Sequence, residues 1–131
     1  METRAPQILL VDDDPLIRDM AAAALARSGF RVLTAGDGAE AVALFAQGKA
    51  DIKMVITDMK MPKMDGNTLA QVLRHVQPGL RMLAMSGQTS GPYAPHAGRF
   101  GDAILYKPFK VQALVTEVLR VLGDAAAPTP T

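Results

Sequence analysis

The chain has 131 residues, of which 49% are hydrophobic and 21% charged, and its formal net charge is +1 at pH 7. This length suits one globular domain, and the composition is far from that of disordered or collagen-like chains. The balanced charge argues against a nucleic-acid or anionic-membrane partner, no apolar run is long enough to cross a bilayer, and the absence of cysteine excludes disulfides and thiolate metal sites. The first residues lack the apolar core of a secretory signal, so we expect a cytoplasmic protein.

Continuous apolar runs alternate with helix-like patterns along the chain. The first run, 8–11, is followed by Asp14 and Pro15, a typical helix start because the Asp oxygen accepts free amide protons and Pro presets a helical φ. Apolar residues then recur at helical spacing up to Gly29, which can adopt the left-handed conformation that ends many helices. A strand over 30–34 is expected next.

The middle of the chain repeats this order. Asp37 and Glu40 resemble a capping pair and predict a helix through Phe45. The apolar run 54–57 predicts a third strand, and a helix over about 67–75 follows after a loop. Runs that are continuous rather than alternating indicate strands covered on both faces, as in a parallel sheet.

The last third predicts strands at 82–85 and 104–106 and a helix over about 111–122. No internal repeat or second domain is visible. We therefore assign residues 1–124 to one domain and expect 125–131, which contain two prolines and three alanines, to form a disordered tail.

The segment 88–101 departs from the regular pattern. Pro92 and Pro95 would disrupt a helix interior, so we expect a fourth helix that is short, irregular or mobile. The alternative is a helix that survives between Pro95 and Phe100.

Strand–helix alternation repeated five times predicts an α/β fold with a doubly wound, five-stranded parallel sheet and right-handed crossovers. Such sheets bind ligands outside the carboxyl ends of their strands, where the strand order reverses. With the order 2-1-3-4-5, the ends of the first and third strands flank that point. Each of four predicted strands ends on side chains that can handle a phosphoryl group, namely Asp12, Asp13 and Asp14 after the first, Asp58 after the third, Ser86 after the fourth and Lys107 after the fifth.

Asp12 and Asp13 are the first candidates for a metal site. Adjacent carboxylates at a strand end repel one another, which favours a divalent cation that keeps both ionised. Oxygen ligands without cysteine or clustered histidine indicate Mg²⁺ rather than zinc. The plainer alternative is that Asp14 caps a helix and its neighbours lie in a solvated loop.

Asp58 is the candidate nucleophile, because a carboxylate can attack a phosphoryl group when a cation offsets the negative charge of both. Ser86 could donate a hydrogen bond to a phosphoryl oxygen, and Lys107 could contribute a positive charge. An Asp that caps a turn would explain Asp58 but would leave Ser86 and Lys107 without a role.

The sequence resembles the receiver domain of two-component response regulators from about residue 7 to residue 122. The resemblance implies a flavodoxin-like, CheY-like fold and a signalling protein rather than an enzyme with an external substrate, its own chemistry being phosphorylation and dephosphorylation of Asp58. The similar segments are Val11-Asp12-Asp13-Asp14-Pro15, Thr57-Asp58-Met59-Lys60-Met61-Pro62-Lys63-Met64-Asp65-Gly66, Met85-Ser86-Gly87 and Tyr106-Lys107-Pro108-Phe109.

The resemblance also implies roles for the site residues. Asp58 would accept the phosphoryl group from a sensor histidine kinase or a histidine phosphotransfer protein. Mg²⁺ would be bound directly by Asp13 and Asp58, through water by Asp12, and by the backbone carbonyl of Lys60. Ser86 and Lys107 would be the switch hydroxyl and the phosphoryl-pairing lysine.

Two features concern the readout. Such domains often carry an aromatic residue three positions before the lysine, where this chain has Ile104, and Tyr106 is not in that register. The apolar arc of the helix 111–122 is broader than one packed face needs, which indicates either deep burial or a surface for a downstream protein or a second copy, formed by helix 4, strand 5 and helix 5. Ile17 and Met20 could dock a phosphodonor helix or complete the core.

The leading hypothesis is a stand-alone receiver that signals by reversible phosphorylation and protein contact. One alternative is a binding module that works without phosphorylation. Another is a haloacid-dehalogenase-type phosphatase, in which Asp12 would be the nucleophile, although this reading leaves Asp58 without a function and the chain has no room for a cap.

Overall fold

The computed structural model describes residues 5–48, 51–100 and 103–123. The expected disordered tail, 125–131, lies outside the described residues. No helix in the described part of the chain is long and apolar enough to cross a membrane.

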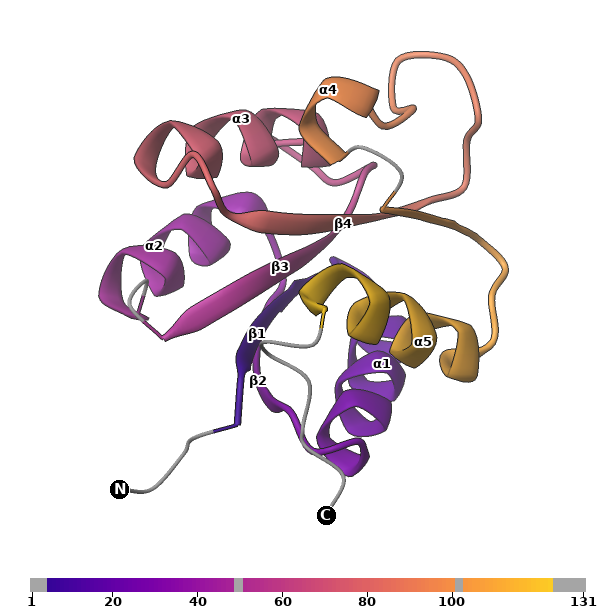
Figure 1. The fold of residues 1–131 in the computed structure, drawn as a ribbon. Coiled ribbons are helices and arrows are strands. Elements are labelled where there is room, and N and C mark those ends of the chain that lie inside the picture. The colour runs from indigo at the N-terminus through magenta and orange to yellow at the C-terminus, as the bar shows by residue number, and fades with distance from the viewer. Residues whose placement is uncertain (1–4, 49–50, 101–102, 124–131) are drawn as a thin grey trace.

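The centre of the molecule is a five-stranded parallel sheet with the order β2-β1-β3-β4-β5 (Figure 1), which confirms the predicted topology. Adjacent strands are in parallel register, with Leu9 opposite Leu33 on one side and opposite Val55 on the other. The strands are β1 Gln7–Val11, β2 Arg31–Ala35, β3 Ile52–Asp58, β4 Arg81–Ser86 and β5 Ile104–Tyr106.

Helices cover both faces of the sheet, α1 and α5 on one face and α2, α3 and α4 on the other (Figure 1). Two apolar clusters result. Leu9 and Val55 face the α2–α3 side, and Ile8 and Ile56 face the α1–α5 side. Burial on both faces explains why the strands read as continuous apolar runs. The helices are α1 Pro15–Arg27, α2 Gly38–Gly48, α3 Gly66–Val76, α4 Ala97–Phe100 and α5 Val111–Leu122.

The predicted start of α1 is confirmed by its hydrogen bonds. The Asp14 carboxylate accepts from the backbone N–H groups of Leu16 at 2.9 Å and Ile17 at 3.4 Å, and Pro15 is the first helical residue. Gly29, just after the helix, has a φ of 98°. These contacts fix the end of β1 and the start of α1, between which the acidic residues lie.

The predicted end of α2 was wrong by three residues, since the helix continues to Gly48. The residues after Phe45 are Ala46 and Gln47, both good helix formers, and their side chains are exposed, so the apolar pattern gives no sign of them. The start is as expected in part: Asp37 accepts from the Glu40 N–H at 2.8 Å, whereas the Glu40 carboxylate accepts from Gly36 rather than from Asp37.

The fourth helix is a single turn, which confirms that it is short, and it lies between Pro95 and Phe100, where the alternative places a helix. Most of the segment before it consists of turns and bends. Asn67, in the first turn of α3, holds this segment through both ends of its side-chain amide: Nδ2 donates to the Ala94 carbonyl at 2.9 Å, and Oδ1 accepts from the His96 N–H at 3.0 Å.

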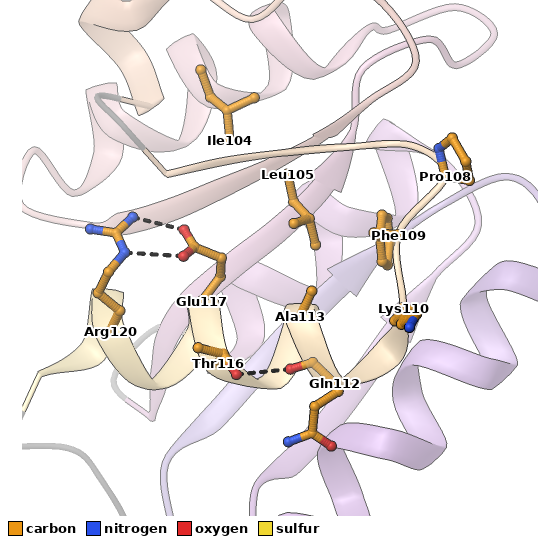
Figure 2. Close-up of a pocket in the computed structure, with 10 residues that line it drawn as sticks. All are labelled: Ile104, Leu105, Pro108, Phe109, Lys110, Gln112, Ala113, Thr116, Glu117 and Arg120. Atoms are coloured by element: carbon orange, nitrogen blue, oxygen red, sulfur yellow. Dashed lines mark hydrogen bonds and ion pairs between the residues drawn. The ribbon is translucent and has the colours of Figure 1, made fainter.

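Helix α5 has the predicted bounds, and most of its broad apolar arc is packed. Leu114, Val118 and Leu122 are fully buried, whereas Leu119 is 38% exposed. Along its edge, α5 and β5 border an open hollow of about 940 Å³ (Figure 2). Apolar side chains from β5 and the following loop meet polar ones from α5 there, and the Glu117–Arg120 ion pair, at 2.8 Å, lies at one end.

Candidate functional site

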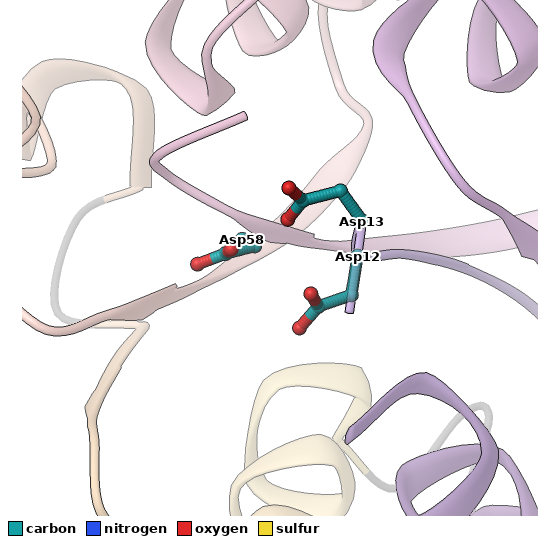
Figure 3. A group of neighbouring side chains, drawn as sticks. All are labelled: Asp12, Asp13 and Asp58. Carbon is teal, nitrogen blue, oxygen red and sulfur yellow. The ribbon is translucent and has the colours of Figure 1, made fainter. Parts of the chain in front are cut away.

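Three carboxyl groups meet at the carboxyl ends of β1 and β3 (Figure 3). Asp12 and Asp13 directly follow β1, and Asp58 is the last residue of β3, its neighbour in the sheet. One oxygen from each carboxylate lies within 4.8 Å of the other two. Asp12 is fully buried, Asp58 is 8% exposed, and Asp13 is exposed. The site is therefore open on one side.

Asp12 is held from both directions. Its Oδ1 accepts from the Asp14 N–H at 2.9 Å, and its backbone carbonyl accepts from the Arg18 guanidinium at 2.9 Å. Its Oδ2 is buried and has no hydrogen-bond partner among the described residues, although the Lys107 ammonium lies 3.6 Å away. A buried carboxylate oxygen without a donor is costly, which makes this atom a natural partner for a cation or for the water bound to one.

Asp58 is positioned by the turn that follows β3. Its Oδ1 accepts from the Met59 N–H at 2.9 Å and from Lys107 Nζ at 3.1 Å. The turn closes where the Gly66 N–H donates to the Met59 carbonyl at 2.9 Å. A Cβ at position 66 would lie 2.6 Å from the Asp58 carbonyl oxygen, so this close approach requires glycine.

Burial raises the pKa of both inner carboxyl groups. For Asp12, desolvation is the largest cause, opposed by the hydrogen bond from Asp14, and the neighbouring Asp58 raises it further. For Asp58, desolvation also dominates, and the charge and hydrogen bond of Lys107 oppose it. One lysine therefore does not offset the negative charge that full ionisation would place there. The atoms that could bind a metal ion here fit Mg²⁺, because they are carboxylate oxygens, one of which is buried without a hydrogen bond. No cysteine or histidine belongs to this group of side chains.

Ser86 and Lys107 lie beside the carboxylates, as the strand-end pattern predicted. Ser86 is 1% exposed at the end of β4, and its hydroxyl donates to the Gln88 carbonyl at 2.8 Å and accepts from the Gln88 N–H at 3.0 Å. The Lys107 N–H donates to the Ser86 carbonyl at 2.7 Å, which joins the ends of β4 and β5. The Ser86 hydroxyl is thus bound to its own loop and not to Asp58.

A cavity of about 310 Å³ gathers the predicted residues. Asp58 and Lys107 lie in it with Ser86, and Lys60, two positions after Asp58, borders it. Asp12 and Asp13 approach the same carboxylate from β1. An acceptor carboxylate, a hydroxyl donor and an ammonium around one space are the groups that nucleophilic attack on a phosphoryl group requires.

Sequence reasoning missed two residues of this region. Tyr93 borders the cavity, and its ring centroid lies 5.6 Å from the Lys60 ammonium. Asn67 fixes the segment that carries Tyr93. Neither residue is part of a strand-end pattern, and no local signal predicts a contact between the β4–α4 segment and Lys60. The three-dimensional fold alone brings them together.

A second hollow, of about 390 Å³, lies between α1 and the loop after β5. Ile17, Met20 and Phe109 line it, and Lys107 borders it as well as the cavity with Asp58. Met20 is 53% exposed. An apolar surface therefore lies directly beside the candidate site.

Comparison with known proteins agrees with this geometry. Residues 8–119 match the family described as the response regulator receiver domain. The chain is 36% identical over 95% of its length to the DNA-binding transcriptional regulator NtrC of Azospirillum brasilense, and 33% identical over 88% to the sensor kinase CckA of Brucella abortus. It covers only 26% and 12% of those proteins, respectively.

Among solved structures, the chemotaxis protein CheY4 of Vibrio cholerae superposes with a TM-score of 0.76 and 31% identity. The superposition covers 89% of this chain and 98% of that one.

Proposed function

Because the chain belongs to the response regulator receiver family, we propose that it is phosphorylated on Asp58, in a Mg²⁺-dependent reaction, by a histidine kinase or a histidine phosphotransfer protein. The observation that carries this proposal is the convergence of four strand ends on Asp58: Asp12 and Asp13 cluster with its carboxylate, and Ser86 and Lys107 line the same cavity as Asp58. A structural role for any one of these residues would not require the others.

In the proposed step, a carboxylate oxygen of Asp58 attacks the phosphorus of a phosphohistidine. A new P–O bond forms, the P–N bond breaks, and the donor imidazole leaves with its electron pair and takes up a proton. Lys107 is already 3.1 Å from Asp58 and places positive charge beside the transferred group. Ser86 donates a hydrogen bond to a phosphoryl oxygen once its hydroxyl turns away from Gln88.

Mg²⁺ would be held by Asp13, Asp58 and the Lys60 carbonyl, and through water by Asp12. When bound, it offsets negative charge on the carboxylates and on the incoming phosphoryl group. The raised pKa values of Asp12 and Asp58 support this part of the proposal, because both carboxylates are ionised more readily when a cation is near.

The partners would bind at two surfaces. The hollow lined by Ile17, Met20 and Phe109 is apolar and adjoins Lys107, which suits a phosphodonor helix that must bring its histidine to Asp58. A downstream protein or a second copy would use the surface formed by α4, β5 and α5, where Leu119 and Tyr106 are exposed. Signalling would then proceed through protein contact. The stand-alone organisation and the cytoplasmic location are separate predictions, made from the sequence.

The readout would differ from the usual aromatic switch. Ile104 occupies the position of the aromatic residue and packs against the core on the α2–α3 side. Its branched aliphatic side chain has no polar tip to exchange between core and surface. We infer that the Ser86–Gln88 contact, which must break when Ser86 engages the phosphoryl group, begins the change in the β4–α4 segment.

Incubation with a small phosphodonor and Mg²⁺ tests this function and separates it from its alternatives. The receiver reading predicts an acid-stable, base-labile adduct in the wild type that is lost in Asp58→Asn. Retention in Asp58→Asn with loss in Asp12→Asn would instead support the phosphatase reading. The absence of an adduct with every donor tried would support a binding module that works without phosphorylation.

A further inference from the structure

The segment between β4 and α4 contributes Tyr93 to the lining of the same cavity as Asp58, Ser86 and Lys107. Tyr93 is half-buried and also packs against the core cluster on the α2–α3 side. The Tyr93 ring therefore forms one wall of the cavity. Moving the ring away from the cavity would expose apolar surface that it now covers, which favours its present position.

Asn67, at the start of α3, holds the segment that carries Tyr93. Its side chain is buried, and its amide pairs with the backbone on both sides of Pro95, through Ala94 and His96. A turn in which the Ala94 N–H donates to the Gly91 carbonyl at 3.2 Å encloses Tyr93. A residue that satisfies both of its polar ends on one segment determines the path of that segment.

The ring also determines where the Lys60 side chain lies. Lys60 is exposed and belongs to the loop directly after Asp58, so its ammonium would otherwise extend into solvent. Its Nζ lies instead 5.6 Å from the Tyr93 ring centroid, within the range of a cation–π interaction. Of the residues that line the cavity, Asp58 is buried, Tyr93 is half-buried and Lys60 is exposed, so Asp58 belongs to its buried end and Lys60 to its solvent side, here called its mouth.

This position matters for the loss of the phosphoryl group. In hydrolysis, a water oxygen attacks phosphorus, the bond between phosphorus and the Asp58 oxygen breaks, and Asp58 leaves as a carboxylate while the water proton goes to the phosphate product or to solvent. Attack is in line with the breaking bond, so the water must arrive from the side opposite Asp58. That side is the mouth of the cavity.

We propose that Tyr93 is a positioning residue of the phosphoacceptor site, which walls the cavity and holds the Lys60 ammonium over its mouth, and thereby slows hydrolysis of the phosphoryl group on Asp58. This inference rests on the proposed phosphorylation of Asp58. It assigns the lifetime of the phosphorylated state to an aromatic side chain in the loop before α4, seven residues after Ser86 and outside the strand-end pattern.

The test follows the decay of the adduct. The full chain is phosphorylated with acetyl phosphate and Mg²⁺, the donor is removed, and the remaining acyl phosphate is measured over time for the wild type, Tyr93→Ala, Tyr93→Phe and Lys60→Met. A cation–π contact of about 0.5–1 kcal/mol corresponds to a change in rate of about two- to fivefold, so Tyr93→Ala is expected to lose its phosphoryl group faster by about that factor. Tyr93→Phe keeps the ring and should decay like the wild type.

Two further variants make the result specific. Val76→Ala shortens an exposed apolar side chain of α3 that does not line this cavity, and its decay rate should be unchanged. The double variant Lys60→Met/Tyr93→Ala should decay no faster than Tyr93→Ala, because both substitutions remove the same contact. Thermal unfolding of each variant separates a local change in decay from a loss of folded protein.

The outcomes distinguish this inference from the proposed function. A wild type that acquires no phosphoryl group contradicts both. A phosphorylated wild type with Tyr93→Ala decaying at an equal or slower rate leaves the function intact and overturns the role of Tyr93. The same holds if Tyr93→Phe decays as fast as Tyr93→Ala, since the ring would then not be the cause.

Discussion

Two buried carboxylates and one lysine dominate the electrostatics of the site. Asp12 and Asp58 both lie within 4.0 Å of Lys107, and Asp13 adds a third acidic group at the exposed edge. Because desolvation raises the pKa of both inner carboxyl groups despite Lys107, ionising these carboxyl groups costs more in the folded protein than in water. These three carboxyl groups and one ammonium group therefore favour the binding of a cation.

Mg²⁺ should therefore stabilise the folded protein, and Asp12 should be needed for the full effect. A ligand at one hundred times its dissociation constant adds about 2.7 kcal/mol to the free energy of unfolding. We expect the melting temperature of the wild type to rise with MgCl₂ and that of Asp12→Asn to rise much less. Asp19→Asn, at an exposed position of α1, is the matched control and should behave like the wild type. An equal rise in all three proteins would contradict a site that includes Asp12.

Much of the site could be predicted from sequence, because strand ends in a parallel sheet converge. Asp58, Ser86 and Lys107 each follow an apolar run, and that position alone places them at one edge. Tyr93 and Asn67 could not be found this way. Their roles depend on the path of an irregular segment, and that path is fixed by two long-range hydrogen bonds that leave no periodic pattern in the sequence.

At the scale of elements, the turn between β3 and α3 does the most to position Asp58. Gly66 begins α3 and packs so closely on the end of β3 that an added Cβ would lie 2.6 Å from the Asp58 carbonyl oxygen and 2.7 Å from Met59 Sδ. Asp65 caps the helix by accepting from the Thr68 N–H at 2.8 Å. Helix start and acceptor strand are thus fixed together.

Gly66→Ala should destabilise the protein by about 1–3 kcal/mol, the usual cost of an added methyl group in a closely packed position. Gly79→Ala is the matched control, because a Cβ at that position has no heavy atom within 4 Å and should cost much less. Chemical denaturation of both variants measures the difference in the free energy of unfolding. Equal values for the two would show that the packing at Gly66 is not restrictive.

The elements also show where sequence patterns lose accuracy. The bounds of α5 were predicted correctly, because apolar periodicity persists to Leu122 and Gly123 follows it. The α2 helix extends past its last buried residue, Phe45, into exposed positions, where the pattern says nothing. The shortness of α4 was predictable from Pro92 and Pro95, whereas its anchoring by Asn67 was not.

The β4–α4 segment is expected to be the least protected part of the core domain. Few backbone hydrogen bonds hold residues 89–93, whereas β3 is paired on both sides and buried except at Lys53. Amide hydrogen exchange should therefore be fast across 89–93 and slowest in β3. Protection of the amides of 89–93 equal to that of β3 would contradict this expectation, which concerns unpaired backbone amides and leaves the Asn67 contacts at Ala94 and His96 in place.

At the scale of the whole molecule, one sheet separates two apolar clusters and brings the site to a single edge. The α1–α5 side lies next to the hollow with Met20, and the α2–α3 side lies under Tyr93 and Asn67. The charged residues at the sheet edge therefore lie beside the helices on both faces of the sheet. A change in the charge of these residues should therefore change the free energy of unfolding of the whole domain.

The metal-free protein should lose stability as the pH rises. Asp12 and Asp58 have folded-state pKa values above the ordinary 3.8, so the folded protein holds more protons than the unfolded chain between 3.8 and the raised values. Their contribution is fully present below 3.8 and is lost as the pH rises through the raised pKa values. Asp58→Asn should flatten this dependence and stabilise the metal-free protein at neutral pH, because it removes a carboxylate whose ionised form is costly to bury. Denaturation in the presence of a chelator, over a range of pH, measures both effects. If Asp58→Asn were less stable than the wild type at neutral pH, the predicted cost of burying the Asp58 carboxylate would be wrong.

The most direct test of the central claim is to identify the phosphorylated residue itself. The protein is treated with acetyl phosphate and Mg²⁺, the acyl phosphate is reduced with borohydride, and the peptides are sequenced by mass spectrometry. Phosphorylation of Asp58 predicts homoserine at position 58, dependent on Mg²⁺ and absent without the phosphodonor. Homoserine at position 12 or 13 instead, or at none of the three aspartates, would contradict it.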